Sequence, residues 1–520
     1  MYRYCIVIDD IWDEKTWEVI KNAFVDSNPR SRIIATTRNP KVSEEIGKVH
    51  RMEKLPESQS RKLLYTRTFG AEEKWPGNND ELAVVSQKIL HRCDGVPLAI
   101  VTIGSLLAGK QIEEWSNVYD SVGFGHGDDR QVNNMKKILS FSYYDLPCHL
   151  RTCMLYLTVY PEDSRINNDD LIYRWIAEGL VQTEEGKEPF KVGESYFLEL
   201  INRGMIQPVE HYGFLNGCRV HDMVLHMIRD LSRDENFFAV QDSKQWSQGS
   251  DVRRLALHGA EHIEVNDRDV PKLRSFNAIR CVTDNTPPVS RFKLLRVLSL
   301  EGCRPLEGHL DTEYLGKLLH LRYLALVDTP IRELSKKIGH LKFLQTLVFT
   351  GTGVEELPTS MKQLTKLMCL LADDKTRVPD WICELTSLAE LSMQGADGDR
   401  CLIKDLGKLR NLRTLYIGIT LQDEGEVRGF LEALSNLEKI EVILPAGRRG
   451  SARWGGCRGP ARDAGGRRGA RGREPGTGCG CRRAGAGAGG WARDAGGRRT
   501  GAGARDRVRV WEGTDRRRKP

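Results

Sequence analysis

The sequence of 520 residues contains no long hydrophobic run, and its 13 cysteines include no Cys-x-x-Cys pair. Its longest apolar-rich stretch, Leu98 to Ala108, is far shorter than the ~20 residues that a helix needs to cross a bilayer. Residues Met1 to Tyr4 lead into no apolar stretch of signal-peptide length. We therefore expect no membrane span and no secretion, and the scattered cysteines favour the reduced thiols of a cytoplasmic protein.

An excess of positive charge is also missing from most of the chain. The sequence holds 78 Lys and Arg against 71 Asp and Glu, but residues 446–520 contribute 21 of the basic residues and only 6 of the acidic ones. The remainder, 1–445, carries 57 basic and 65 acidic residues. An acidic body of this kind excludes a uniformly basic nucleic-acid binder.

Residues 446–520 form a Gly/Arg/Ala-rich tail that holds 21 of the 50 glycines and has almost no apolar spacing. Such a segment buries too little surface to offset its chain entropy, so we expect it to be disordered. It is either an RGG-like tail whose arginines pair with RNA phosphates, or GC-rich sequence translated outside the true frame or exon. The sparse aromatic residues favour the second interpretation.

Two predicted strands near the N-terminus end in residues that suit phosphate chemistry. Residues 4–10 have the pattern of a buried parallel strand and end in Asp9 and Asp10. Residues 31–38 predict a second strand, which follows a helical stretch and ends in Arg38. In nucleoside-triphosphatase folds such an acid holds Mg²⁺ and a neighbouring acid orients water. The alternative is that both carboxylates only cap the next helix.

Six segments then match one known family in order, over about 220 residues. Tyr4 to Trp12 resembles the Walker B segment of plant NB-ARC leucine-rich-repeat disease resistance proteins, and Trp12 indicates their coiled-coil class. Residues 31–38 resemble the sensor strand of that family, and residues 93–100 resemble its Gly-Leu-Pro-Leu motif. Residues 153–163 and 171–179 resemble two segments of its winged helix, and residues 220–222 resemble its Met-His-Asp motif.

The resemblance implies a site for ADP or ATP with Mg²⁺. By that resemblance Asp9 carries the metal, Asp10 orients water, Arg38 senses the γ-phosphate, Pro97 packs on adenine and His221 touches the β-phosphate of ADP. Each residue also has a structural alternative. The aspartates could cap a helix, the proline could break one, and a lone histidine is usually a satisfied core residue.

A phosphate-binding loop of the pattern Gly-x-x-x-x-Gly-Lys-Ser/Thr is not found in the sequence. In the family this loop precedes Walker B, and its backbone N–H groups cradle the phosphates. The near-match from Gly104 to Lys110 is followed by Gln111 and continues a helix-like run, which indicates a structural helix end. We therefore expect an N-terminally truncated, non-enzymatic chain that binds ADP or ATP weakly or not at all.

The middle of the chain predicts helices and then a winged helix. Residues 131–235 hold 11 basic and 16 acidic residues, so specific binding of duplex nucleic acid is not expected. His258 and His262 fit the His-x-x-Glu-His pattern of zinc peptidases, but their strand-and-turn context disfavours the single helix that such a site needs.

Leucine-rich repeats follow, with steps of 21 to 26 residues that lie inside the range for this repeat. The predicted solenoid runs from Val252 to Pro445. Each unit buries its inward leucines only against the next coil, so many units must stack for the solenoid to be stable. In the family the repeats restrain the switch and sense pathogen effectors or guarded host proteins. The repeats start at Leu295, Leu321, Leu344, Leu367, Leu388, Leu412 and Leu437. The outward residues, candidates for partner contact, are Tyr323, Ala325, Thr346, Val348, Glu390, Ser392, Thr414 and Tyr416.

The predicted fold class is multidomain α/β and α, ending in a solenoid and a disordered tail. The expected function is that of a plant intracellular immune receptor, switched by ADP and ATP and forming an oligomer on activation if it behaves as the family does. The alternative is an interaction-only fragment or pseudogene product that binds partners through its repeats. The predicted domains are the C-terminal part of a P-loop-type nucleotide-binding α/β domain (1–55), a helical domain (56–127), a winged helix (128–240), the leucine-rich repeats (250–445) and the tail (446–520).

Overall fold

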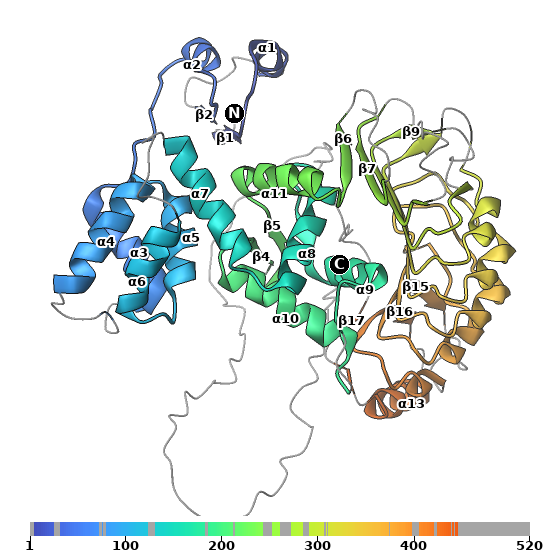
Figure 1. Ribbon diagram of the computed structural model, residues 1–520. Helices are drawn as coiled ribbons and strands as arrows, with labels where there is room; N and C mark the ends of the chain where they lie inside the picture. Colours follow the sequence, from blue (N-terminus) through green and yellow to red (C-terminus); the bar gives the residue numbers. More distant parts are fainter. Residues whose placement is uncertain are drawn as a thin grey trace, which may run out of the picture. The chain divides into compact units, whose positions relative to one another are not determined.

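The computed structural model divides the chain into two compact units, Met1–Ile138 and Leu139–Pro520, which are described separately (Figure 1). The structure describes residues 5–24, 32–71, 75, 80–122, 131–182, 186–211, 214–242, 252–260, 272–283, 291–305, 308, 310–373, 375–397, 405–420, 424–437, 439–440 and 442–445. The Gly/Arg/Ala-rich tail, Glu261 and His262 lie outside these residues.

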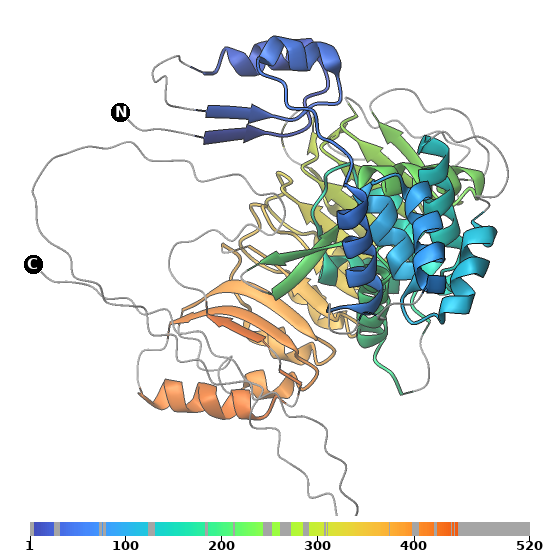
Figure 2. The same cartoon turned by 90° about the vertical axis from the view of Figure 1, so that its left-hand side faces the viewer.

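The first unit begins with a small α/β layer. Strands β1 (Cys5–Ile8) and β2 (Arg32–Ala35) pair in parallel, and helices α1 (Glu14–Lys21) and α2 (Pro40–Ile46) lie on one side of them (Figure 2). Buried side chains of Ile11, Trp17 and Val42 form its core. On the strands, Val7 and Ile34 remain exposed, so this layer leaves apolar surface uncovered.

A helical bundle completes the first unit. Its core contains the buried side chains of Leu64, Ile89, Ile103 and Trp115. Gly95 has a φ of +68°, and a Cβ atom there would stand 2.6 Å from the carbonyl oxygen of Leu55, so the turn before the third of these helices requires glycine. The helices are α3 (Glu57–Phe69), α4 (Asp80–Cys93), α5 (Pro97–Leu107) and α6 (Ile112–Ser121).

The second unit opens with the predicted winged helix. Its three-stranded antiparallel sheet has the order β3-β5-β4, and Tyr143, Leu150, Trp175 and Phe197 are buried in its core. The elements are α7 (Gln131–Tyr144), which starts in the first unit, α8 (Cys148–Tyr156), η2 (Leu157–Val159), β3 (Ile166–Asn167), α9 (Asn168–Glu178), α10 (Pro189–Asn202), β4 (Gln207–His211), β5 (Phe214–Arg219) and α11 (Asp222–Asp234).

A parallel sheet of ten strands forms the inner layer of the solenoid (Figure 1). Leu298, Leu324, Leu347 and Leu370 point into one continuous core and are fully buried, which confirms the predicted repeats. The strands are β6 (Ala239–Asp242), β7 (Arg254–His258), β8 (Ser275–Ile279), β10 (Val297–Glu301), β12 (Tyr323–Val327), β13 (Thr346–Val348), β14 (Cys369–Leu371), β15 (Glu390–Asp397), β16 (Thr414–Thr420) and β17 (Val442–Pro445).

Outside the sheet, most coils carry a short helical element, and two of them carry a second short strand. Strands β9 (Val282–Thr283) and β11 (Arg304–Pro305) form a separate parallel pair. The helical elements are η5 (Glu313–Lys317), η6 (Lys336–His340), η7 (Thr359–Gln363), η8 (Asp380–Glu384), η9 (Leu406–Lys408) and α13 (Glu424–Ser435).

Two boundaries of the repeat prediction need correction. The sheet starts at Ala239, before the predicted Val252, because the strand after α11 pairs in parallel with β7. In the last coil Thr414 pairs with Val442, so the residue equivalent to Leu412 is Ile440 and not Leu437. Helix α13 lies in the chain between these two strands and lengthens this coil.

Candidate functional site

The structure brings together three of the predicted nucleotide-site residues at the carboxyl ends of β1 and β2. The hydroxyl of Thr36 donates to Asp9 and accepts from the backbone N–H of Asp10 at 2.8 Å. Arg38 pairs with Asp10 at 3.2 Å and stacks over Trp12. Neither aspartate caps α1, because its N-cap is Asp13. The helix-capping alternative for Asp9 and Asp10 is therefore wrong.

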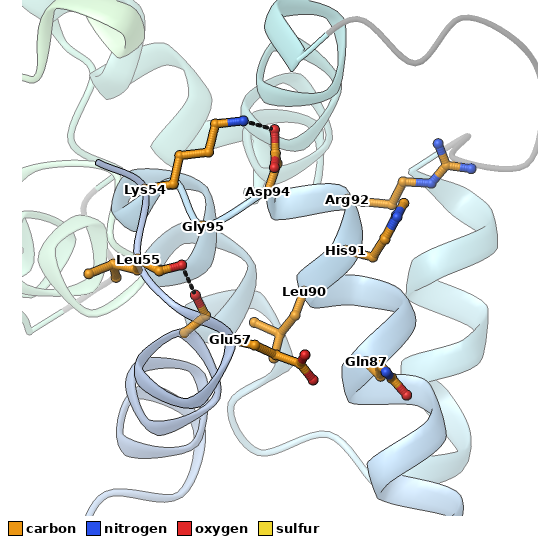
Figure 3. Close-up of a pocket in the computed structure, with 10 residues that line it drawn as sticks. Lys54, Leu55, Glu57, Gln87, Leu90, His91, Arg92, Asp94 and Gly95 are labelled. Atoms are coloured by element: carbon orange, nitrogen blue, oxygen red, sulfur yellow. Dashed lines mark hydrogen bonds and ion pairs between the residues drawn. The ribbon is translucent and has the colours of Figure 1, made fainter. Parts of the chain in front are cut away.

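Pro97 begins α5 at its first turn, where a missing N–H costs nothing. Just before it, a cavity of about 560 Å³ lies between the segment preceding α3 and the end of α4 (Figure 3). Lys54 pairs with Asp94 at 2.6 Å on its wall, where the charged side chains of Glu57 and Arg92 also lie. The near-match to a phosphate loop is part of α5 and the turn after it, so its interpretation as a structural helix end is confirmed.

His221 lies in the second unit, where it caps α11. Its Nδ1 accepts from the backbone N–H of Met223 at 3.2 Å, and its side chain is exposed. The alternative of a buried core histidine is therefore wrong for this residue.

A heavily bonded charged residue of the second unit is Arg174, which the sequence did not single out. It lies on α9, which starts at its N-cap Asn167 and ends at Gly179, the latter in the left-handed region. One turn earlier Asp170 accepts from Arg174 Nε at 2.8 Å. A fully buried arginine is rare unless it is paired, so its place inside the apolar run Leu171–Ala177 was the signal that could have revealed it.

Arg174 crosses from the winged helix to the repeats. The residue is 2% exposed, and its guanidinium donates to Asn277 at 2.9 Å on β8, and to Ser299 at 3.2 Å and Glu301 at 2.6 Å on β10. It also stacks over the ring of Tyr323 on β12, 4.7 Å from the centroid. One cation therefore joins α9 to three consecutive coils of the solenoid.

The surroundings keep Arg174 charged. Burial lowers the pKa of its guanidinium, but the negative charges of Asp170 and Glu301 and the nearby hydroxyls of Tyr323 and Tyr160 outweigh this and raise the pKa. Tyr323 also donates its hydroxyl proton to Asp170. A buried pair of this kind costs ~3–5 kcal/mol when one partner is removed, because the other charge is left uncompensated.

A second polar cluster lies further along the sheet, around Glu390 on β15. Burial and the carboxylate of Asp169 raise the pKa of Glu390 to about 8. Arg413, in the next coil, donates to the hydroxyl of Tyr173 at 3.3 Å and stacks 3.5 Å from the ring centroid of Phe190. The winged helix therefore contacts the later coils through α9 and α10 as well.

Contacts at both ends extend this interface. Arg254 on β7 pairs with Glu178 at 2.9 Å, and Lys439 pairs with Glu188 next to α10. The ring of His258 bonds through Nε2 to the carbonyl of Val159 at 2.9 Å, so this histidine serves the same interface. The winged helix thus contacts the solenoid from β7 to the coil before β17.

These contacts change the interpretation of the outward residues of the strands. Tyr323, Ala325, Thr346, Val348 and Glu390 are buried, and Ser392, Thr414 and Tyr416 are half-buried. Tyr323 and Glu390 face the winged helix. The sequence could indicate which side chains point outward from the sheet, but it could not indicate that another domain of the same chain covers them.

Comparisons with known proteins agree with this fold. The NB-ARC domain family model matches residues 1–74, the disease resistance protein winged helix domain matches 159–228, and the leucine-rich repeat region matches 272–456. Disease resistance protein RGA5 of Oryza sativa subsp. japonica is 31% identical over 473 residues, which cover 85% of this chain and 42% of that protein. Disease resistance protein RPP8 of Arabidopsis thaliana is 29% identical over 474 residues, covering 85% of this chain and 51% of that protein. A crystal structure of an internalin from Listeria monocytogenes overlays 37% of this chain and 54% of its own, with 18% identity and a TM-score of 0.31.

The architecture is that of a multidomain protein with NB-ARC, winged-helix and leucine-rich-repeat parts. The chain is homologous to the plant disease resistance proteins that combine these domains, as its motifs predict. It spans about half the length of the curated relatives it matches. In the part of the chain that the structure describes, no helix combines the length and apolarity needed to cross a membrane.

Proposed function

We propose that this chain serves plant defence as part of an intracellular receptor whose repeats hold the winged helix closed. The observation that carries this proposal is the burial of Arg174, whose charge is shared between α9 and the first coils of the solenoid. Separating the two domains leaves Glu301 without Arg174 and takes the Tyr323 hydroxyl from Asp170, whereas Arg174 keeps Asp170 on its own helix. The contact therefore favours one closed state, as a restrained two-state switch requires.

In this proposal a pathogen effector or guarded host protein acts by binding the opened repeats more tightly than the closed ones. Tyr323 and Glu390 are covered by the winged helix in the closed state. A partner that uses these side chains must compete with α9 for them. Its differential affinity for the two states sets how far the equilibrium shifts.

Nucleotide exchange is the second part of the proposal and rests on the family resemblance. Asp9, Asp10 and Arg38 lie together at strand ends, a position that suits Mg²⁺ and phosphate. Asp9 would hold the metal, Asp10 would orient water, Arg38 would meet the γ-phosphate, Pro97 would lie against adenine and His221 would meet the β-phosphate of ADP. Because the sequence contains no complete phosphate loop, we propose that this chain binds ADP weakly or not at all.

Hydrogen exchange of the full chain tests the restraint. Arg174→Ala should speed exchange of α9, β10 and β12 amides by about 100-fold or more, given the ~3–5 kcal/mol cost of a broken buried pair. The matched control is Arg233→Ala, which removes an exposed arginine of the same domain, 76% exposed in its side chain, and should leave these amides unchanged. Exchange in β13 and β14 reports whether the solenoid still folds. If α9 stays as protected in Arg174→Ala as in the parent chain, the restraint does not exist.

Calorimetric titration with ADP and Mg²⁺ tests the nucleotide part and separates it from the alternative. Micromolar affinity that Asp9→Asn weakens would contradict weak binding and support a functional switch in this chain. Absence of heat at millimolar ADP would favour the interaction-only alternative. Neither outcome bears on the Arg174 contact, so the two parts of the proposal fail independently.

A further inference from the structure

Helix α9 turns two neighbouring stripes of side chains toward the solenoid. Asp170, Arg174 and Glu178 stand four residues apart along the helix and therefore share one stripe. Asp169 and Tyr173 form a second stripe, which lies about 100° around the helix axis from the first. The two stripes contact different coils, which divides the interface into two halves with different chemistry.

The first stripe contacts the early coils, β7 to β12, where charged groups pair with opposite charges. Arg174 donates to Glu301 at 2.6 Å on β10, and Glu178 accepts from Arg254 at 2.9 Å on β7. The side chains of Arg174 and Glu178 are 3% and 1% exposed, so water and salt screen these charge-assisted bonds little. We call this the early half of the interface; it comprises Asp170, Arg174, Glu178, Arg254, Asn277, Ser299, Glu301 and Tyr323.

The second stripe contacts the late coils, β14 to β16, with a poorer match of charge. Burial and the carboxylate of Asp169 raise the pKa of Glu390 to about 8, and Arg413 opposes this rise without cancelling it. Arg413 itself donates to the neutral hydroxyl of Tyr173 at 3.3 Å and stacks on the ring of Phe190. Closure at this end therefore either holds two acids together or keeps one of them protonated, and both cost free energy.

The outermost contact of the late coils is solvated. Lys439 pairs with Glu188 at the start of α10, and their side chains are 41% and 43% exposed. An exposed ion pair of this kind contributes little stability, because water and salt screen it. We call the contacts of the late coils the late half of the interface; it comprises Asp169, Tyr173, Glu188, Phe190, Cys369, Glu390, Arg413 and Lys439.

We propose that the interface opens in two steps, in which the late half separates first while the early half stays closed as a hinge. The inference rests on the proposed restraint and adds the order in which that restraint is released. Rotation of the winged helix about the first stripe lifts Asp169 and Tyr173 from the sheet and leaves Arg174 on its partners. Local opening takes this route because it breaks the weaker contacts and keeps the buried charge pairs.

The first step uncovers part of the inner face of the repeats. Cys369 and Glu390 are buried in the closed interface, and Ser392, Thr414 and Tyr416 beside them are half-buried. A partner that lies along β14, β15 and β16 gains this surface without breaking the early half. Its differential affinity for the half-open state sets how far the equilibrium shifts.

Thiol alkylation of the full chain tests the order of opening. Cys369 on β14 reports the late half. Val297 has the equivalent place on β10, because β10, β12, β13 and β14 pair in register, so Val297→Cys reports the early half. Both residues are fully buried. We expect iodoacetamide to label Cys369 about 10-fold or more faster than the thiol of Val297→Cys, with each rate read by peptide mass spectrometry and divided by its rate in denaturant.

Two substitutions separate the halves. Arg413→Ala should speed labelling of Cys369 by about 10-fold, because it removes a desolvated cation–π contact, and should leave the thiol of Val297→Cys unchanged. Arg174→Ala should speed labelling of the Val297→Cys thiol by about 10-fold or more, because it breaks a buried charge pair. The matched control is Lys408→Ala, which removes an exposed lysine that pairs with Asp405 inside the solenoid, and both rates should stay as in the parent chain.

Cys303 provides the reference for global unfolding. It lies in the core of the solenoid and is fully buried, so only unfolding of the coils exposes it. Its labelling should remain slower than that of Cys369 in every variant, which shows that the solenoid is folded. Labelling of Cys369 no faster than that of Cys303 would refute a separate opening of the late half.

Three further results would overturn the proposal. Equal acceleration of both probes by Arg413→Ala would mean that the interface opens in one piece. Faster labelling of Val297→Cys than of Cys369 would place the hinge at the late coils. An unchanged Cys369 rate in Arg413→Ala would mean that this contact does not hold the late half. Failure of the proposed restraint gives a different pattern, in which Arg174→Ala leaves both probes as in the parent chain.

Discussion

Tyr323 donates its hydroxyl proton to Asp170, although the two residues stand 153 positions apart in the chain. One belongs to the inner face of the repeats and the other to the first turn of α9. The same carboxylate accepts from Arg174. The interface between winged helix and repeats is therefore organised around one carboxylate that serves both domains.

Removing the Tyr323 hydroxyl should weaken this interface. Tyr323→Phe keeps the ring under Arg174 but deletes one hydrogen bond to a charged group, which contributes about 1.5–3 kcal/mol. We expect the thermal midpoint of the full chain to fall by a few degrees, measured by calorimetry. Tyr144→Phe, on an exposed ring, should change it by less than one degree, and an equal fall in both would refute a specific role for the Tyr323–Asp170 bond.

The interface should loosen as the pH rises. Burial and Asp169 raise the pKa of Glu390 to about 8, above the ordinary value of a glutamate, so the folded state favours the protonated acid. Its stabilising contribution is fully present below the unfolded pKa and is lost as the pH rises through about 8. Arg413, Tyr173 and Cys369 also face this carboxyl, and all three oppose the rise of its pKa.

Denaturant midpoints at pH 6.0, 7.0 and 8.5 check this prediction. The parent chain should lose stability over this range, and Glu390→Gln should lose less because it carries no titrating proton. Glu384→Gln, which alters an exposed ion pair with Lys362, should keep the slope of the parent chain. A slope that is the same in parent and Glu390→Gln would assign the pH dependence to other groups.

Glu178 and Arg254 should be strongly coupled. The side chain of Glu178 is 1% exposed, so Arg254→Ala leaves a buried carboxylate without its cation, at a cost of ~3–5 kcal/mol. Arg254→Ala/Glu178→Gln should recover much of this loss, which a double-mutant cycle of unfolding free energies measures. Additive effects of the two changes would show that the pair contributes no interaction energy.

Gly95 should tolerate no side chain. Its φ of +68° and the carbonyl of Leu55 at 2.6 Å from the position of a Cβ act together against alanine. Gly109 also has a positive φ, of +79°, but open space around it, so Gly109→Ala isolates the cost of the backbone conformation. We expect Gly95→Ala to destabilise the helical bundle of the first unit well beyond Gly109→Ala, as seen by hydrogen exchange of α3 and α5. Equal effects would mean that the contact with Leu55 relaxes at no cost.

Local patterns were sufficient to predict much of this molecule. The strand Cys5–Ile8 was predictable from its unbroken run of β-branched side chains, but its predicted burial was wrong, because Cys5 and Val7 are exposed and Ile6 and Ile8 are half-buried. The solenoid was predictable for a similar reason, since each coil repeats the same leucine spacing to fill one shared core. Pro97 and Asp13 each stand at a helix start, but from the sequence alone Pro97 was a possible helix breaker and the possible caps were Asp9 and Asp10.

Only the tertiary structure decided which of these features meet. Arg174 was a single polar residue in an apolar run until β8 and β10 supplied its partners, more than 100 positions away in the chain. Glu390 belonged to an outward row until the packing of α9 against the repeats buried it and placed Asp169 beside it. Hydrophobic periodicity constrains neighbours along the chain, whereas the desolvation and pairing of charges depend on neighbours in space. The leucines thus determined the coils from the sequence alone, and the packing of the domains decided which charges are buried, paired or left facing water.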